Sequence, residues 1–143
     1  HYNGIIDFKN GCTGSIVTSF DVQYGRKGRY IEVLGSEGTL RVPDPNDFGG
    51  KIGLLRAGES EFTEIPIVRP YTENSRGLGL ADMAHALRTG RRHRANCDQT
   101  CHVLEIMTSF EKSSRENRTI QLETTFERGA PMKYTKLLGI LDD

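Results

Sequence analysis

The sequence contains no tryptophan, and only 8% of its 143 residues are aromatic. Cysteine is also scarce, because Cys12, Cys97 and Cys101 are the only three. An odd, sparse set suits a reducing compartment better than a disulfide scaffold. No apolar run approaches the roughly 20 residues that a membrane helix needs, and no signal-peptide pattern opens the chain. The sequence therefore predicts a cytoplasmic protein without membrane contact.

Net charge is absent as well, since 19 lysines and arginines balance 19 aspartates and glutamates. A neutral chain creates no general field that attracts nucleic acid. The one basic cluster has no interleaved aromatic residues and consists of Arg88, Arg91, Arg92 and Arg94. We interpret it as a solvated connector that complements the dipole of the preceding helix, and phosphate or nucleic-acid binding is the less favoured alternative.

What the sequence does contain is a change of hydrophobic period near residue 75. Before this point, strand-like segments alternate with turns, at residues 2–9, 12–20, 29–35, 39–42, 51–56 and 61–67. Asn10-Gly11 predicts a type I′ turn, with positive φ at both central residues, in the first hairpin. A seventh strand is predicted at residues 119–122.

After this point the period is that of helices. The first is predicted over residues 76–89, with Asn74 or Ser75 as the N-cap and Gly90 as the left-handed C′ residue. Its apolar stripe follows the i, i+3, i+4, i+7 pattern and comprises Leu80, Met83, Ala84 and Leu87.

A second helix is predicted to begin after Asn96. Gln99 lies three residues further on, which is the spacing of a capping box, and Asn117 is a suitable C′ residue. The predicted apolar face of this helix comprises Cys101, Val103, Leu104, Met107 and Phe110.

These elements predict an α+β fold with a large, mostly antiparallel sheet and helices packed on one face. Two helices cannot cover both faces, yet strand residues of both parities are apolar. The open face is therefore expected to be an oligomer interface, most simply of a two-fold homodimer. The alternative is that residues 124–143 cover part of this face. We expect one domain over residues 1–123 and a tail of uncertain structure over residues 124–143.

Two short patterns suggest bound groups, and we favour neither. His93, Cys97, Cys101 and His102 resemble a zinc set, but structural zinc usually has tighter ligand pairs. Gly77-Leu78-Gly79 resembles half of a dinucleotide-binding loop, but Asp82 replaces the third glycine and no βαβ unit follows. We therefore predict no metal site and no cofactor site within this chain.

The best candidate for binding is the turn at residues 70–77. Tyr71, Asn74 and Arg76 bring hydrogen-bonding groups to the edge of a sheet and the start of a helix, beside Glu73. A polyol or a carboxylate would suit this mixture of donors and acceptors. The alternative is that Asn74 only caps the helix while Arg76 pairs with Glu73 or Asp82.

Four stretches, in this order, carry a resemblance to a known family. They are residues 8–14 (FKNGCTG), 31–40 (IEVLGSEGTL), 43–50 (PDPNDFGG) and 70–90. Over roughly residues 1–122 the chain resembles the C-terminal domain of the Gfo/Idh/MocA oxidoreductases, which include glucose–fructose oxidoreductase and inositol dehydrogenase. Each stretch is generic by itself, and their order and spacing make the resemblance specific.

The resemblance implies an antiparallel sheet with helices on one face and a dimer contact on the other. It also implies a parent enzyme with an N-terminal Rossmann domain that binds NAD or NADP, and a sugar or polyol substrate. The family's catalytic residues map upstream of His1, so no catalytic role is assigned to Asp82 or His85. We expect Tyr71, Asn74 and Arg76 to border the substrate cleft, and we expect the chain alone to be inactive. The alternative is a non-catalytic, dimeric binding or scaffold domain.

Overall fold

The computed structural model describes residues 1–21, 23, 30–73 and 75–133. The α+β class and the antiparallel strands predicted from the sequence are confirmed. The described elements follow in the order β1 (Tyr2–Asp7), β2 (Thr13–Thr18), β3 (Ile31–Gly35), β4 (Gly38–Val42), β5 (Ile52–Arg56), β6 (Thr63–Ile65), α1 (Leu78–Thr89) and α2 (Cys97–Glu116). The chain divides into two compact units, one of His1–Tyr24 with Arg92–Gly129 and the other of Gly25–Arg91 with Ala130–Asp143.

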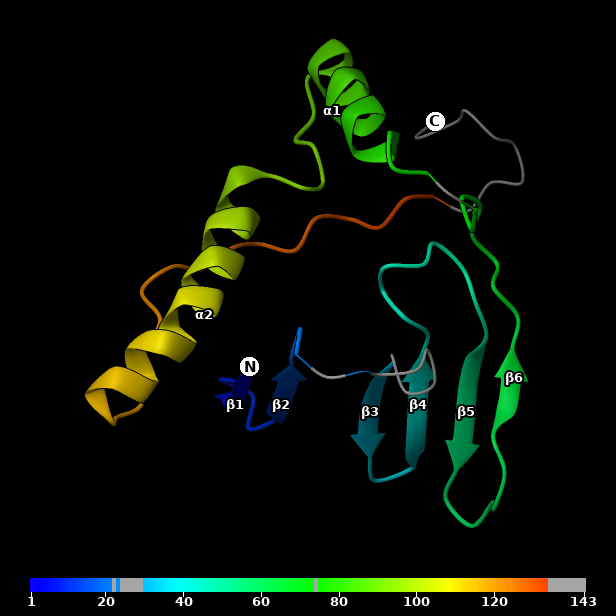
Figure 1. Ribbon diagram of the computed structural model, residues 1–143. Coiled ribbons are helices and arrows are strands. Elements are labelled where there is room, and N and C mark those ends of the chain that lie inside the picture. Colours follow the sequence, from blue (N-terminus) through cyan, green and yellow to red (C-terminus); the bar gives the residue numbers. More distant parts are fainter. Residues whose placement is uncertain (22, 24–29, 74, 134–143) are drawn as a thin grey trace. The chain divides into compact units, whose positions relative to one another are not determined.

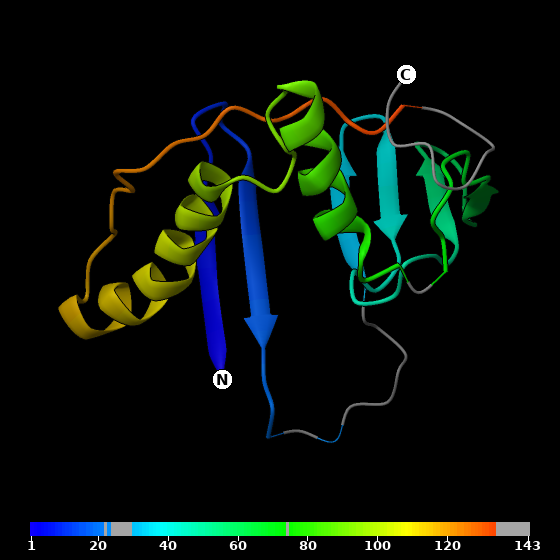
Figure 2. The ribbon, with the colours of Figure 1, turned by 90° about the horizontal axis from the view of Figure 1, so that it is seen from above.

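In the first unit, helix α2 packs against a two-stranded hairpin. Strands β1 and β2 pair antiparallel from Tyr2↔Thr18 to Asp7↔Thr13, and α2 lies beside β1 (Figure 2). The ring of Phe110 lies so close to Gly4 that a Cβ at this position would overlap it. Glycine is therefore needed at residue 4 because the helix approaches the strand through an aromatic ring.

The hairpin turn differs from the type I′ turn that Asn10-Gly11 predicted. Gly11 has a φ of 87°, but Asn10 is not among the described residues with positive φ. The N–H of Gly11 donates to the carbonyl of Phe8 at 2.9 Å, and the side chain of Asn10 accepts from the N–H of Cys12 at 3.1 Å. Because Asn10 bonds its own backbone two residues on, a longer turn with a single left-handed glycine replaces the two-residue turn.

In the second unit, β3, β4, β5 and β6 form a four-stranded antiparallel meander in sequence order (Figure 1). The six strands before residue 75 were thus predicted correctly. They form two separate sheets among the described residues, however, where the sequence had suggested one large sheet. Part of the connection between β2 and β3, residues 22 and 24–29, lies outside the described residues.

Helix α1 begins later than predicted. Its N-cap is Gly77, which makes no side-chain capping bond, while the carbonyl of Ser75 accepts from the N–H of Leu78 in the preceding turn at 2.9 Å. Ser75 is therefore not the cap, and Asn74 lies outside the described residues. The predicted end is confirmed, because Gly90 has a left-handed φ of 71°.

Both predicted caps of α2 are confirmed. The side-chain oxygen of Asn96 accepts from the N–H of Gln99 at 3.1 Å, and Asn117 has a left-handed φ of 50°. The N–H of Asn96 donates to the carbonyl of Arg94 at 3.0 Å. The predicted capping box is therefore only half formed.

The apolar stripes predicted for the two helices are largely exposed in the structure. On α1, Leu80 and Leu87 are 72% and 78% exposed, while Asp82 and Ala86 on another face are buried. On α2, Leu104 and Met107 are 59% and 61% exposed. The spacing of apolar residues shows that a helix has an apolar face, but it does not identify the surface that packs against this face.

The predicted strand at residues 119–122 is also absent from the described structure. Residues 118–126, which we call the strap, instead run along α2. The carboxylate of Glu105 accepts from the N–H groups of Glu123 at 2.8 Å and Thr124 at 2.9 Å, and from the hydroxyl of Thr124. His102 adds a 2.9 Å bond to Thr124 and a ring contact with Phe126. Helix side chains thus bond the backbone directly after the predicted strand, at residues 123 and 124.

The remaining described part of the chain's end, residues 127–133, contains no helix or strand. The rest of the predicted tail, residues 134–143, lies outside the described residues, so the alternative that residues 124–143 cover the open sheet face is not tested. No described helix is long and apolar enough to cross a membrane.

Replacing Gly4 tests the contact with Phe110. We expect Gly4→Ala to destabilise the protein by about 1–3 kcal/mol, because a methyl group is forced into the ring. In urea unfolding, Phe110→Leu should recover part of this loss in the double variant. Gly79→Ala is the control: its Cβ would enter open space on a helix, so it should stabilise by about 0.5–1 kcal/mol. Equal effects at the two glycines would contradict this packing.

The strap predicts a pH dependence of stability. The backbone N–H groups of Glu123 and Thr124, with the Thr124 hydroxyl, lower the pKa of Glu105 from its ordinary 4.5 to about 2. A lowered folded-state pKa contributes stability that is present above pH 4.5 and is lost as the pH falls towards 2. Glu105→Gln should flatten the stability profile in this window, measured by urea unfolding, whereas Glu111→Gln should leave it unchanged. A wild-type stability profile that is already flat between pH 4.5 and 2 would show that the bonds from Glu105 to the strap do not stabilise the fold.

Candidate functional site

Two connections meet at one end of the four-stranded sheet (Figure 1). The loop at residues 43–51 joins β4 to β5, and the segment at residues 66–77 leads from β6 to α1. Because neighbouring strands are antiparallel, β4 and β6 run in the same direction, and their C-terminal ends lie at the same end of the sheet. This edge therefore carries the residues that the sequence proposed for binding.

The two connections are in close contact. A Cβ built on Gly49 would lie 2.5 Å from the carbonyl oxygen of Thr72, so only glycine fits at residue 49. Gly50 has a φ of 116° and lies against the ring of Pro43, where a Cβ would be 2.8 Å from the proline Cβ. Asp44 stabilises the same loop by accepting from the N–H of Asn46 at 2.9 Å. The loop is thus held against the segment that leads into α1.

Tyr71 has an unusual backbone. Its φ of 67° lies in the left-handed region, which costs a residue with a bulky side chain on the order of 1–3 kcal/mol. Its side chain is half-buried, and Tyr71 also takes part in further interactions with its surroundings. The fold holds this tyrosine in a strained position at the edge where the two connections meet.

Arg76 lies on the same segment, and an aromatic ring holds its side chain. The guanidinium carbon is 5.6 Å from the centroid of the Phe48 ring, within range of a cation–π interaction. Within the described part of the chain, Arg76 makes no ion pair with Glu73 or Asp82, which was the alternative considered for it. Its hydrogen-bond donors therefore remain available to a ligand. Asn74, the third predicted residue, lies outside the described residues.

The sequence did not identify Phe48 and Gly49 as part of this site. Both belong to the 43–50 stretch, which entered the sequence-based prediction only as one of the four stretches that carry the family resemblance. The available signal was an aromatic residue, Phe48, within a run of proline, aspartate, asparagine and glycine. A surface loop of this composition has no core in which the ring could be buried, so the ring indicates a contact with another segment or with a ligand.

Asp82 has a structural role in α1. It is only 5% exposed, and its carboxylate accepts a 2.6 Å charge-assisted bond from Arg91, just beyond the end of the helix. Removing one partner of such a buried pair leaves an uncompensated charge, which is strongly destabilising. The pair therefore fixes the position of the chain where it leaves the C-terminal end of α1.

The residues at the start of α1 do not fit a dinucleotide. Gly77 and Gly79 have open space at their Cβ positions, but they follow a strand of an antiparallel meander rather than a βαβ unit. Asp82, where the third glycine would be, is buried and paired with Arg91. The structure gives no support for cofactor binding at this helix.

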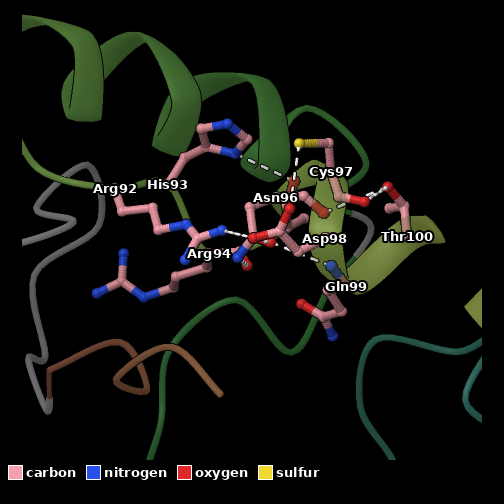
Figure 3. A network of polar contacts seen from close by, with 9 residues as sticks. Arg92, His93, Arg94, Asn96, Cys97, Asp98, Gln99 and Thr100 are labelled. Atoms are coloured by element: carbon pink, nitrogen blue, oxygen red, sulfur yellow. Dashed lines mark hydrogen bonds and ion pairs between the residues drawn. The ribbon is translucent and has the colours of Figure 1, made fainter. Parts of the chain in front are cut away.

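The polar network at the start of α2 has a capping role (Figure 3). Arg92 donates to the side chains of Asn96 and Asp98, and Asn96 accepts from Gln99 as the N-cap. Of the basic cluster, Arg91 and Arg92 are thus engaged in ion pairs with Asp82 and Asp98. Arg91 is partly buried, in contrast to the solvated connector that the sequence suggested.

The four residues of the zinc alternative are not brought together. The ring of His93 bonds the carbonyl of Ala95 at 3.0 Å, and His102 bonds Thr124 in the strap. Cys97 and Cys101 are exposed free thiols. Among the described residues, no group of three or more histidine, cysteine or carboxylate side chains is arranged to hold a metal ion.

Comparison with known proteins gives one match. The family described as "Oxidoreductase family, C-terminal alpha/beta domain" matches residues 2–122, which is most of the chain. The match ends within the strap, before the bonds that Glu105 makes to residues 123 and 124. No curated protein and no solved structure shows significant similarity. The chain therefore belongs to the Gfo/Idh/MocA oxidoreductase family, and its residues 2–122 are that family's C-terminal α/β domain.

Proposed function

We propose that this chain is the substrate-binding and oligomerisation portion of an NAD(P)-dependent oxidoreductase that acts on a sugar, a polyol or a related hydroxyl compound. Family membership supports an oxidoreductase as the parent enzyme. The nicotinamide cofactor would be held outside this chain, because the glycines that begin α1 do not fit it. On this proposal the chain alone is inactive.

The observation that carries the substrate proposal is the contact between residues 43–50 and 69–77. Phe48 holds the guanidinium of Arg76, and the fold holds Tyr71 in a strained conformation near it in sequence. Strained residues held on rigid loops are common at ligand sites. The guanidinium donates several hydrogen bonds and the phenol both donates and accepts, which suits the hydroxyl groups of a polyol. We assign Tyr71, Asn74 and Arg76 to the border of the substrate cleft.

The proposed oligomer interface is one face of the four-stranded sheet, which we call the aliphatic face. The strand register places one apolar set on this face: Ile31, Val33, Leu40, Val42, Ile52, Leu54 and Ile65. Helix α1, in the same unit, does not pack on the sheet. A continuous aliphatic face of this kind suits a two-fold contact with a second copy.

On the opposite face of this sheet, polar and aromatic side chains contact one another. Arg41 lies between the rings of Tyr30 and Phe62, with its guanidinium carbon 4.6 Å and 4.0 Å from their centroids. It also donates two bonds to one carboxylate oxygen of Glu32, at 2.8 Å and 3.1 Å. Since these polar and aromatic groups satisfy one another, we place the interface on the aliphatic face.

Arg76 tests the substrate assignment. In the intact oxidoreductase, Arg76→Ala should lower kcat/KM about ten- to a hundredfold, because a hydrogen bond from a charged group contributes about 1.5–3 kcal/mol. Arg88→Ala is the matched control, since it removes an exposed arginine near the far end of α1, the helix that follows Arg76, and it should have no effect. Initial rates with a panel of sugars and polyols measure both. An unchanged kcat/KM for Arg76→Ala would remove it from the site.

Two adjacent residues of β3 test the interface. Val33 and Leu34 are 55% and 78% exposed and point to opposite faces of the sheet. Val33→Glu should weaken self-association of the intact protein at least tenfold, because it puts an unpaired charge into an apolar interface. Leu34→Glu should leave association unchanged. Light scattering across a concentration series measures the self-association of both variants. Equal self-association of the two would exclude the aliphatic face as the interface.

A further inference from the structure

The strap has the features of an edge strand without a partner. Its burial alternates, with Ile120 and Leu122 half-buried and Gln121 and Glu123 exposed, as in a strand with one covered face. Within the described residues, the backbone groups of Ile120, Gln121 and Leu122 make no hydrogen bond. Unpaired backbone groups in an extended segment are a template for a further strand.

The strap is also held in place at both ends. At its start, the N–H of Arg118 donates to the carbonyl of Ser113 at 3.3 Å, and the hydroxyl of Ser113 donates back to the carbonyl of Arg118 at 2.7 Å. At its other end, Glu105 binds the backbone of Glu123 and Thr124. From Ser113 to Glu105 the helix rises about 12 Å, and the strap covers this distance in five residues, so it runs lengthwise along α2 rather than folding back on itself.

A groove of about 320 Å³ lies between α2 and the strap. Thr108, Lys112 and Arg115 line it from the helix, and Ile120, Gln121 and Glu123 line it from the strap. This volume is at the lower end of the roughly 300–1,000 Å³ of small-ligand sites, so it suits a short segment. A helix beside an extended edge is the arrangement in which β-augmentation domains take a peptide as an added strand.

The charges of the groove are separated along its length. Glu105 and Glu123 lie at one end, and the carboxylate of Glu105 is already engaged by the strap. Lys112 and Arg115 lie towards the other end, and neither has an ion-pair partner among the described residues. Glu111 also lines this part of the groove, so the attraction for an anion is modest. A ligand that meets these cations would carry a carboxylate.

We propose that the groove between α2 and the strap binds a short extended peptide segment of a partner protein. The segment pairs with the backbone of Ile120, Gln121 and Leu122 and places an acidic side chain near Lys112 and Arg115. This activity is separate from the oxidoreductase reaction, because none of the groove residues belongs to the connections that carry Tyr71 and Arg76. It does not rest on the proposed function.

The test uses the intact protein with a labelled Ile120 methyl group, observed by NMR. The probe is a capped five-residue peptide of alternating threonine and valine with a central glutamate. We expect it to shift the Ile120 methyl signal and to leave that of Ile52, in the other unit, unchanged. A peptide with a central lysine should bind about three- to fivefold more weakly, as expected for an exposed ion pair. A version that is N-methylated at its three central residues should not bind.

Charge reversal provides the matched comparison. Lys112→Glu should abolish the preference for the glutamate peptide, whereas Lys9→Glu, which makes the same charge change on the hairpin, should keep it. Two results would overturn the proposal. One is no shift of the Ile120 methyl at millimolar peptide. The other is equal binding of the glutamate, lysine and N-methylated peptides, which would indicate non-specific contact.

Discussion

The structure depends most on the antiparallel register of the four-stranded sheet. Because side chains alternate between faces, the pairing of Val33 with Leu40 and of Leu40 with Leu54 gathers aliphatic residues on one side. A shift of one residue would move this set to the other side and would also separate Arg41 from Glu32. The register thus makes the two faces chemically different. The same register brings the two connecting loops to one end of the sheet, so the proposed interface and the proposed binding site lie on different parts of one sheet.

The loop contacts at this end of the sheet hold the residues that we propose to border the substrate cleft. Gly49 lets the 43–50 loop approach the backbone of Thr72, and Phe48 then lies against Arg76. The cost of the left-handed conformation at Tyr71 must be offset by these surrounding contacts. Loops of this kind can vary in sequence while the strands that hold them remain unchanged.

Local patterns predicted most of the local structure, although the type I′ turn at Asn10-Gly11 and the Ser75 cap of α1 were wrong. Six strands, both helices, the Asn96 cap and the left-handed Gly90 follow from alternation, helical period and cap chemistry. Predictions that depended on tertiary partners failed. Residues 119–122 have a strand sequence, but the carboxylate of Glu105 competes for the backbone that follows them. Likewise, the period of Leu80 and Leu87 indicates an apolar face, but burial of that face requires a partner that the sequence does not name. Within the candidate site, Tyr71 and Arg76 were proposed from residue type alone. The contribution of Phe48 depends on a contact between two loops that are distant in sequence, so only the structure reveals it.

The most direct test of the account is hydrogen–deuterium exchange of the intact oxidoreductase, followed at two protein concentrations and with or without a saturating polyol substrate. We expect exchange in β3, β4 and β5 to slow as the protein concentration rises, because the aliphatic face becomes an interface. We also expect the substrate to slow exchange in residues 43–50 and 69–77. Unchanged exchange in these strands across the concentration range, together with no protection of the two loops, would contradict the account.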